Sequence, residues 1–327
     1  MGRMVDGVWR PGKVTEDSAD GAFKRQDAGF RDWITVDGGP GPDGQPGRPA
    51  TAGRYHLYVS YACPWAHRTL IVRALKGLEE VIGVSVVDPV MLDHGWTFAT
   101  DRGGTGDPLH GAEYLWQLYA RARNGYSGKV TVPILWDIET GAIVSNESSE
   151  IIRMLTSAFD GLGAATGNYY PIAPRPQIDA INAEIYDRVN NGVYKAGFAT
   201  TQAAYEDAVR PLFATLDRLE ARLASRRWLV GDAMTEADIR LFTTLVRFDP
   251  VYVGHFKCNI RRIADYTALE AYLERMLAIP KIAATVHLDH IKTHYYASHR
   301  DLDPTGIVPV GPDLPWADLI MPSPSSR

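Results

Sequence analysis

The chain has 327 residues, of which 45% are hydrophobic and 22% charged, and its 34 basic and 39 acidic side chains give a net charge of −5. At about 100–200 residues per domain, this length predicts two domains, and the near-balance of charge argues against a nucleic-acid partner. No apolar run approaches the ~20 residues that cross a membrane, and residues 1–13 lack the apolar centre of a signal peptide. The 2 cysteines are too few for a disulfide framework, so we expect a soluble, cytoplasmic enzyme.

The first 53 residues are predicted to be an N-terminal extension. Residues 23–36 mix aromatic and charged side chains, as does a segment that docks on another surface. Residues 37–53 (DGGPGPDGQPGRPATAG) are so rich in Gly and Pro that they favour a loop over a helix or a strand ladder. We therefore expect regular structure to begin after Gly53.

A thioredoxin-like pattern follows over residues 54–160. The apolar run 55–59, the helical spacing of leucines up to residue 78 and the β-branched run 81–87 predict a βαβ unit with parallel strands. A helix is expected over 108–121, a hairpin from 130–136 and 142–145, and a helix over 147–159. The order βαβ–ββα is that of a thioredoxin-like domain.

Beyond a connector at residues 161–175 the pattern is helical. Leucines spaced by four, three and four residues mark one face of a helix, and the sequence from Thr235 to Asp238 has the form of a capping box. A further helix is expected over 265–277, ended by Pro280, and the proline-rich stretch 300–327 is expected to run extended along the surface. The leucines are Leu212, Leu216, Leu219 and Leu223. The predicted fold class is thus α/β plus all-α, with an all-helical domain over 176–327.

Cys63 lies between the first strand and the helix of the βαβ unit, directly before Pro64. Proline is favoured in the first turn of a helix, so Cys63 is placed at or beside the N-cap. The N–H groups and the positive dipole end there favour thiolate over thiol, and His67 and Arg68 follow on the next turn. The alternative is a small buried hydrophobe, which is the common role of a reduced cysteine and the one we expect for Cys258.

The residues after Cys63 do not support a dithiol mechanism. A Cys-x-x-Cys motif would place its second cysteine at position 66, which is Ala66. Cys63 can therefore form a mixed disulfide only with an external thiol, and glutathione is the abundant one. A metal site from Cys63 and His67 lacks further ligands at zinc spacing, so no metal is expected.

Two features are expected beside the cysteine. If the bond between Val132 and Pro133 is cis, the backbone of Val132 would face outward and could pair with an extended peptide, whereas a plain strand-entry proline is the alternative. Glu147 and Ser148 begin the next helix, whose N-terminus suits a carboxylate, while Glu147 suits an α-amino group. Ordinary capping by Ser145 and Glu147 is the alternative there.

The segment 58–68 (YVSYACPWAHR) resembles the active-site segment of the Xi-class glutathione transferases, the glutathionyl-hydroquinone reductases. Residues 94–98 (HGWTF), 131–137 (TVPILWD), 145–150 (SNESSE), 190–199 (NNGVYKAGFA) and 294–299 (HYYASH) resemble the same family. The similarity runs from about Phe23 to Pro312. The string Cys-Pro-Trp-Ala-His-Arg is specific, whereas Cys-Pro alone would not be.

The resemblance implies a glutathione-binding domain, a helical substrate domain and a homodimer. It also implies the reaction: glutathionyl-hydroquinone plus glutathione gives hydroquinone plus glutathione disulfide, through a mixed disulfide on Cys63, with glutathione as co-substrate and no metal. Lys129 stands where arginine is expected in many relatives, which gives up a bidentate contact with a carboxylate. The residues implied to hold glutathione are Trp96, Lys129, Val132, Glu147 and Ser148, and those implied to line the hydroquinone pocket are Tyr194 with Tyr295 or Tyr296.

The remaining residues of note are His287, His290 and His294, which share one helical face. Three imidazoles so spaced could bind zinc, but no cysteine or carboxylate joins them, so a role near the tyrosines is favoured. Tyrosines in a helical domain are more often core than catalytic, and the role of Tyr194 and Tyr295 rests on the resemblance.

Two other functions are compatible with these residues. An Omega-like monothiol thioltransferase or dehydroascorbate reductase would use the same cysteine, so Cys63 does not separate it from the hydroquinone reductase. The tyrosines and the Trp96 segment favour the hydroquinone. The second alternative is a non-catalytic binding module with a transferase fold, in which Cys63 would be dispensable.

Overall fold

The computed structural model describes residues 2–12 and 20–320. Within these, the chain forms two compact units, the first made of residues 2–12 and 26–168 and the second of residues 20–25 and 169–320. The chain thus passes from one unit to the other between residues 168 and 169, inside the predicted connector. In the described part of the chain, no helix combines the length and the apolar character needed to span a bilayer.

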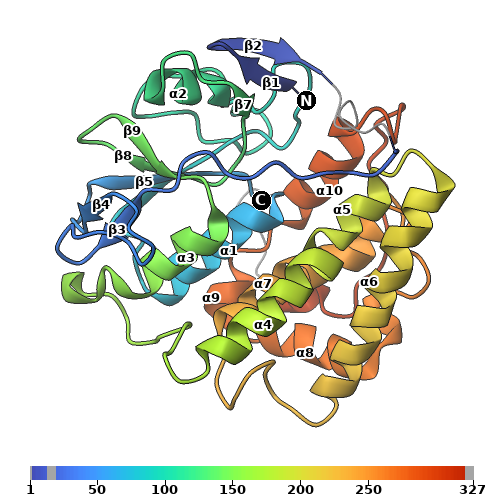
Figure 1. The fold of residues 1–327 in the computed structure, drawn as a ribbon. Helices are drawn as coiled ribbons and strands as arrows, with labels where there is room; N and C mark the ends of the chain where they lie inside the picture. Colours follow the sequence, from blue (N-terminus) through green and yellow to red (C-terminus); the bar gives the residue numbers. More distant parts are fainter. Residues whose placement is uncertain (1, 13–19, 321–327) are drawn as a thin grey trace. The chain divides into compact units, whose positions relative to one another are not determined.

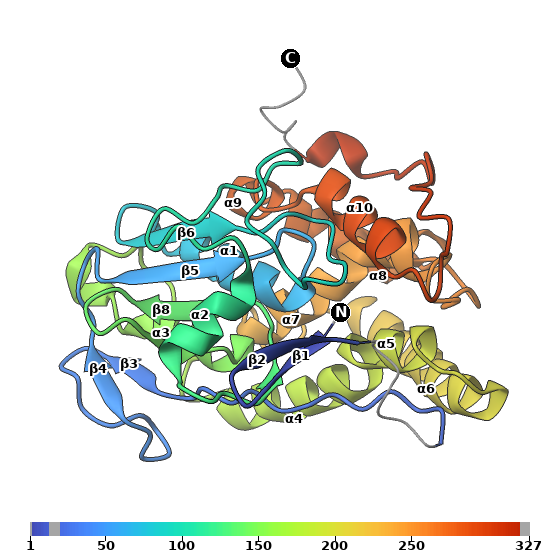
Figure 2. The same cartoon turned by 90° about the horizontal axis from the view of Figure 1, so that it is seen from above.

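The first unit is organised around a four-stranded sheet of order β6-β5-β8-β9. Figure 1 labels β5, β8 and β9, and Figure 2 labels β6 beside β5. Strand β5 (Tyr55–Val59) leads through helix α1 (Pro64–Leu75) to β6 (Ile82–Val86), and β5 and β6 pair in parallel. Strands β8 (Ile134–Asp137) and β9 (Ala142–Ser145) complete the sheet as an antiparallel hairpin, and α3 (Ser148–Ser157) packs on α1. All five residues of β5 are buried, which explains its unbroken apolar run. The βαβ–ββα prediction is confirmed.

The N-terminal segment has regular structure, contrary to the prediction. Strands β1 (Gly2–Val5) and β2 (Val8–Pro11) form an antiparallel hairpin that adds to β7 (Gly128–Lys129) in a second sheet. The two loop residues, Asp6 and Gly7, have φ angles of 47° and 79°, as a type I′ turn requires. The Asp-Gly pair was the signal that would have revealed this hairpin in the sequence.

The Gly/Pro-rich stretch also takes part in a ladder, so the loop prediction for residues 37–53 is wrong at its centre. Strand β4 (Gly47–Pro49) pairs in parallel with β3 (Trp33–Thr35). The pairing is stabilised from outside the stretch, because the Arg48 guanidinium donates to the carboxylates of Asp32 and Asp137, at 2.9 Å in each case. The ion pairs of Arg48 thus outweigh the low strand propensity of residues 47–49, and the sequence pattern of residues 37–53 does not reveal them.

Asp137 is a fully buried carboxylate at the end of β8. It accepts hydrogen bonds from Arg48, from Arg54 at 2.7 and 2.9 Å, and from Thr140 at 2.8 Å. Burial alone would raise its pKa, but the hydrogen bonds from Arg54, Thr140 and Arg48 outweigh burial and lower the pKa to about 2. Asp137 is therefore charged in the native state at any pH near neutrality, and it joins β4 to the main sheet.

Replacing Asp137 with asparagine is expected to lower the free energy of unfolding by about 2–3 kcal/mol at pH 7, since two guanidinium groups lose their charged acceptor. Because the native pKa lies below the unfolded value of about 3.9, this stabilisation is present above pH ~4 and is lost as the pH falls towards 2. Urea unfolding of wild type and Asp137→Asn between pH 7 and pH 3 measures it, with exposed Asp43→Asn as control. A stability gap that stays constant over this range would contradict the ion-pair account.

Helix α2 (Leu115–Ala122) is shorter than the helix predicted over residues 108–121. The N–H groups of Leu109 and Ala112 donate to the Asp107 carboxylate, which holds this part in a turn. The N–H groups of Glu113 and Tyr114 donate to the Gln117 side chain, which caps the helix. Side chains thus satisfy the backbone donors that a longer helix would use.

The second unit is all-helical, which confirms the predicted fold class (Figure 2). The leucine face is buried on α6, and Thr235 with Asp238 forms the predicted capping box of α7. The prediction over 265–277 is met by α8, whereas Pro280 begins a helix of its own. The α-helices are α4 (Arg175–Ile185), α5 (Gly192–Gly197), α6 (Gln202–Leu223), α7 (Glu236–Arg247), α8 (Thr267–Leu277), α9 (Pro280–Ala283) and α10 (Leu288–Ser298), with π-helical turns at Tyr186–Asn190 and Phe248–Tyr252. Residues 300–316 have no helix or strand, and the end of the predicted tail, 321–327, lies outside the described residues.

Candidate active site

Cys63 is the N-cap residue of α1, as predicted, and the backbone switches there from strand to helix. Its φ and ψ of −77° and 121° are extended, and Pro64 occupies the first position of the helix. The side chain is partly exposed and is not in a disulfide. Its Sγ lies 3.6 Å from the carbonyl oxygen of Val132. The thiol is therefore held at the positive end of a helix dipole, beside a backbone segment that precedes β8.

The bond between Val132 and Pro133 is cis. The Val132 side chain is buried, while its carbonyl oxygen is the atom that approaches the cysteine. The structure thus brings Cys63 and Val132 together, as the sequence predicted for a cis bond. A peptide whose own sulfur met Cys63 would reach the backbone of Val132 as well.

Glu147 and Ser148 lie at the start of α3, next to α1. Glu147 is the N-cap, and its carboxylate accepts from the N–H of Ser149 at 2.9 Å, so the capping role left open by the sequence is present. The Ser148 hydroxyl accepts from Arg68 of α1 at 3.3 Å. The N-terminal turns of α1 and α3 are therefore tied together by a hydrogen bond.

Trp96 and Lys129 come from two other segments of the first unit. Trp96 is 6% exposed, and its carbonyl oxygen accepts from the N–H of Leu115 at the start of α2. Lys129 is on the short strand β7, and its carbonyl oxygen accepts from the Tyr126 hydroxyl at 3.0 Å. Hydrogen bonds to neighbours in the same unit thus fix the backbones of Trp96 and Lys129. The points from which the two side chains extend are therefore fixed as well.

In the second unit, three tyrosine hydroxyls form a chain of hydrogen bonds. The hydroxyls of Tyr194 on α5 and Tyr295 on α10 are 2.6 Å apart, and Tyr295 is 3.0 Å from the hydroxyl of Tyr252. Burial raises the pKa of Tyr295 and of Tyr252 well above 10, so both keep their protons at any physiological pH. A protonated chain of this kind can donate a hydrogen bond to an oxygen that gains negative charge.

The structure distinguishes Tyr295 from Tyr296, which the sequence could not do. The Tyr296 hydroxyl donates to the carbonyl oxygen of Pro250 at 3.5 Å, and its ring packs on His255. Consecutive residues of a helix point about 100° apart, so only one of the pair can join the chain of hydroxyls. Tyr295 is that residue.

Two contacts of Tyr194 and Tyr295 were missed from the sequence. Tyr252 lies on a π-helical turn 43 residues before Tyr295, and no local pattern connects them. Arg25 reaches Tyr194 from the N-terminal segment, with its guanidinium carbon 4.9 Å from the ring centroid, and donates to Asn191 at the start of α5. Of the segment 23–36 that was predicted to dock on another surface, residues 23–25 pack within the second unit, whereas residues 26–36 belong to the first unit.

Comparison with known proteins places this geometry in a family. Residues 62–158 match the model of the glutathione S-transferase N-terminal domain, and residues 202–275 match that of the C-terminal domain. The glutathionyl-hydroquinone reductase YqjG of Escherichia coli is 56% identical over 98% of each chain, and its glutathione-bound structure superposes with a TM-score of 0.88. The chain belongs to the glutathionyl-hydroquinone reductases. The glutathionyl-hydroquinone reductase PcpF of Sphingobium chlorophenolicum is 53% identical, over 99% of this chain and 100% of the PcpF chain. The crystal structure of the Xi glutathione transferase of Phanerochaete chrysosporium is 51% identical and superposes with a TM-score of 0.85, over 92% of this chain and 99% of that chain.

In this reductase, His287, His290 and His294 do not form the three-histidine zinc site that their spacing could allow. His294 packs edge-on against Tyr295 and His299, at 5.3 Å between ring centroids in both cases, whereas His287 and His290 pair with each other at 6.1 Å. Across residues 2–12 and 20–320, no three His, Cys, Asp or Glu side chains are arranged to hold a metal ion. The other cysteine, Cys258, is buried, and burial raises the pKa of its thiol far above the usual range.

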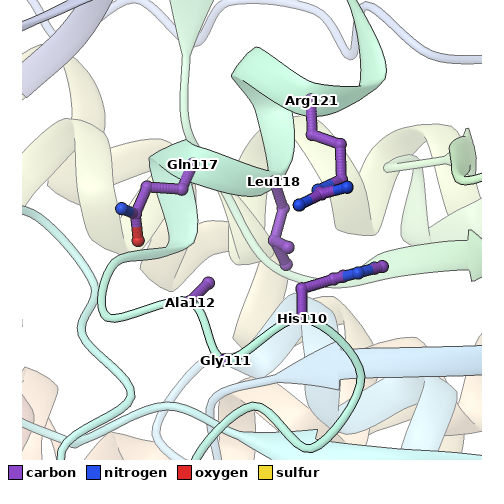
Figure 3. Close-up of a pocket in the computed structure, with 6 residues that line it drawn as sticks. All are labelled: His110, Gly111, Ala112, Gln117, Leu118 and Arg121. Atoms are coloured by element: carbon purple, nitrogen blue, oxygen red, sulfur yellow. The ribbon is translucent and has the colours of Figure 1, made fainter.

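The first unit of the reductase also has a hollow of about 390 Å³ at the start of α2 (Figure 3). It is lined by His110, Gly111, Ala112, Gln117, Leu118 and Arg121. The Arg121 side chain extends from the helix towards His110, while Gln117 points away and caps α2. This lining has no cysteine, so thiol chemistry does not belong here.

Proposed function

We propose that this reductase removes glutathione from glutathionyl-hydroquinones in two thiol steps carried by Cys63. In the first, the hydroquinone leaves and Cys63 holds glutathione as a mixed disulfide; in the second, another glutathione releases glutathione disulfide. The observation that carries the proposal is the position of Cys63, a single thiol at a helix N-terminus 3.6 Å from the Val132 backbone, in a chain 56% identical to a glutathionyl-hydroquinone reductase.

The first step forms a sulfur–sulfur bond and breaks a sulfur–carbon bond. The Cys63 thiolate attacks the thioether sulfur, which is oxidised to the disulfide level, and the electron pair of the broken bond goes to the ring carbon. A carbon leaving group is poor unless its charge is delocalised. If the ring first adopts its keto tautomer, the electron pair is delocalised onto the carbonyl oxygen as the C–S bond breaks. The ring becomes aromatic as a phenolate in that step, and the oxygen then gains a proton to give the hydroquinone.

One hydroxyl of the Tyr194–Tyr295 pair donates a hydrogen bond to the oxygen that gains this charge, and the other hydroxyl of the pair donates to the first. Their hydroxyls are linked at 2.6 Å, and the raised pKa of Tyr295 keeps its proton in place. Donors placed in advance where charge develops lower a barrier more than they strengthen ground-state binding. Tyr252 contributes a third hydroxyl, 3.0 Å from that of Tyr295, which extends the chain.

The glutathione moiety is assigned to the first unit. The Val132 backbone pairs with the peptide, Glu147 meets the α-amino group and the α3 N-terminus at Ser148 meets a carboxylate. Lys129 and Trp96 supply a cation and an indole donor. With lysine at position 129, the carboxylate contact is a point-charge interaction, without the two-pronged fork of an arginine.

We also propose a homodimeric assembly and a cytoplasmic location. The homodimer follows from the resemblance to the Xi class. The reducing cytoplasm suits a mechanism that consumes glutathione and needs Cys63 reduced. Neither cysteine of this chain is in a disulfide, which is compatible with that compartment.

Steady-state activity on a set of glutathionyl-hydroquinones, compared with a small mixed disulfide and dehydroascorbate, tests the proposed function. We expect kcat/KM for the hydroquinone conjugates to exceed that for the other substrates by at least about tenfold, because only they use the tyrosine donors. A preference for the mixed disulfide or dehydroascorbate would favour an Omega-like thioltransferase. No turnover of any of them would favour a non-catalytic binding module.

A further inference from the structure

The N-terminal hairpin, residues 2–11, is built onto the strand that carries Lys129. Strand β1 pairs antiparallel with β7, which sets Arg3 opposite Lys129, and the Met4 side chain beside it is fully buried. At the turn, the N–H of Gly7 donates to the carbonyl oxygen of Tyr126 at 3.0 Å. In the described sheet, β7 has β1 as its partner strand. The backbone of Lys129 is therefore extended because the hairpin is there.

The same hairpin reaches the turn that precedes Trp96. The indole Nε1 of Trp9 donates to the carbonyl oxygen of Asp93 at 2.8 Å. Its ring lies over Gly95, where a Cβ would come within 2.9 Å of the ring carbons. Gly95 has a φ of 70°, so glycine is needed there both for the backbone and for the approach of Trp9. Trp9 thus covers the residue adjacent to Trp96.

The hairpin therefore converges on two separate segments, 92–96 and 126–129, and each ends in one of the residues assigned to glutathione. The two contacts are independent, one a backbone ladder and the other an indole packed on a turn. A short strand and a glycine turn have little stability of their own, because they bury little surface. Holding them in the bound geometry beforehand removes an ordering cost from ligand binding.

We propose that the N-terminal hairpin is a positioning element of the glutathione site, in which Trp9 acts through Trp96 and strand β1 acts through Lys129. The proposal rests on the assignment of Trp96 and Lys129 to glutathione made above. Trp9 is a positioning residue, since it raises the fraction of chains whose 92–96 turn is ready to bind. Trp9 does not change the rate of the bond-breaking step at Cys63.

The test is the affinity of the full-length protein for reduced glutathione, by calorimetry, together with KM and kcat for a glutathionyl-hydroquinone. For Trp9→Ala, we expect the Kd and KM to rise about fivefold to tenfold, with kcat within about twofold of wild type. Trp9→Phe keeps a ring over Gly95 but loses the N–H donor to Asp93, so an intermediate Kd is expected. Val8→Ala, at an exposed position on the same strand, is the matched control and should bind as wild type does.

A double-mutant cycle shows whether Trp9 acts through Trp96. In a Trp96→Ala background, Trp9→Ala should change the Kd less than about twofold, because the group that it positions is gone. The same fivefold loss in both backgrounds, or wild-type affinity in a folded Trp9→Ala or Trp9→Phe protein, would overturn the proposal. So would a Trp96→Ala protein that binds glutathione normally. A wild-type chain that binds glutathione but leaves glutathionyl-hydroquinones intact would instead overturn the proposed function, and the binding cycle would still decide the role of the hairpin.

Discussion

Cys63→Ala is expected to abolish turnover of glutathionyl-hydroquinones, with a loss of at least about 10³-fold in kcat, while the Kd for glutathione stays within about threefold. The reason is that the sulfur makes and breaks the covalent bond, whereas we propose that the tripeptide is held by Val132, Glu147 and Ser148. Cys63→Ser should leave negligible activity, because a hydroxyl forms no disulfide and is a weak nucleophile. Kinetics and calorimetry on the two variants measure this, with wild type prepared in parallel.

The covalent intermediate gives an independent readout of the same prediction. Wild-type protein incubated with glutathionyl-hydroquinone alone should gain the mass of one glutathione on Cys63, and added glutathione should remove it. Cys258 is an internal control, because its burial and raised pKa keep it unreactive in the folded protein. Protein that stays unmodified after exposure to the substrate would rule out the two-step route.

The positions of Cys63 and Glu147 in the first unit could be predicted because their signals are local. The order strand, Cys63, Pro64, helix is contained in a few residues, and it determines both the fold element and the position of the thiol. The same holds for Glu147 at the start of α3. Local signals of this kind predict structure because the backbone geometry of a helix start depends on its own residues.

The structural features that could not be predicted depend on contacts between residues that are far apart in the sequence. Strand β4 forms because Arg48 meets Asp137, 89 residues away, and the Tyr252 contact with Tyr295 spans 43 residues. Neither contact produces a periodic pattern of residues in the sequence. The hairpin at Asp6 and Gly7 is different, since its turn residues did carry a local signal and the expectation of an unstructured extension passed over it.

The tyrosine chain leads to the prediction with the second-largest effect. Tyr295→Phe is expected to lower kcat for glutathionyl-hydroquinones by about 10²-fold, since one hydrogen-bond donor to the developing enolate is removed. Tyr194→Phe should act similarly, and the double variant should lose less than the product of the two losses, because the hydroxyls act as one chain at 2.6 Å. Steady-state kinetics on the three variants measure the losses.

The neighbouring residue supplies the control that separates this role from packing. Tyr296→Phe removes a hydroxyl that bonds to Pro250 instead of the chain, so kcat should stay within about twofold of wild type. Turnover of a small mixed disulfide should be unaffected in Tyr295→Phe, because no carbon leaving group is expelled there. Because burial holds the pKa of Tyr295 well above 10, the loss should also be the same at pH 6 and pH 8, both far below the ionisation of this phenol. Equal losses on both substrates would mean that Tyr295 supports the fold of the helical unit and does not assist the leaving hydroquinone.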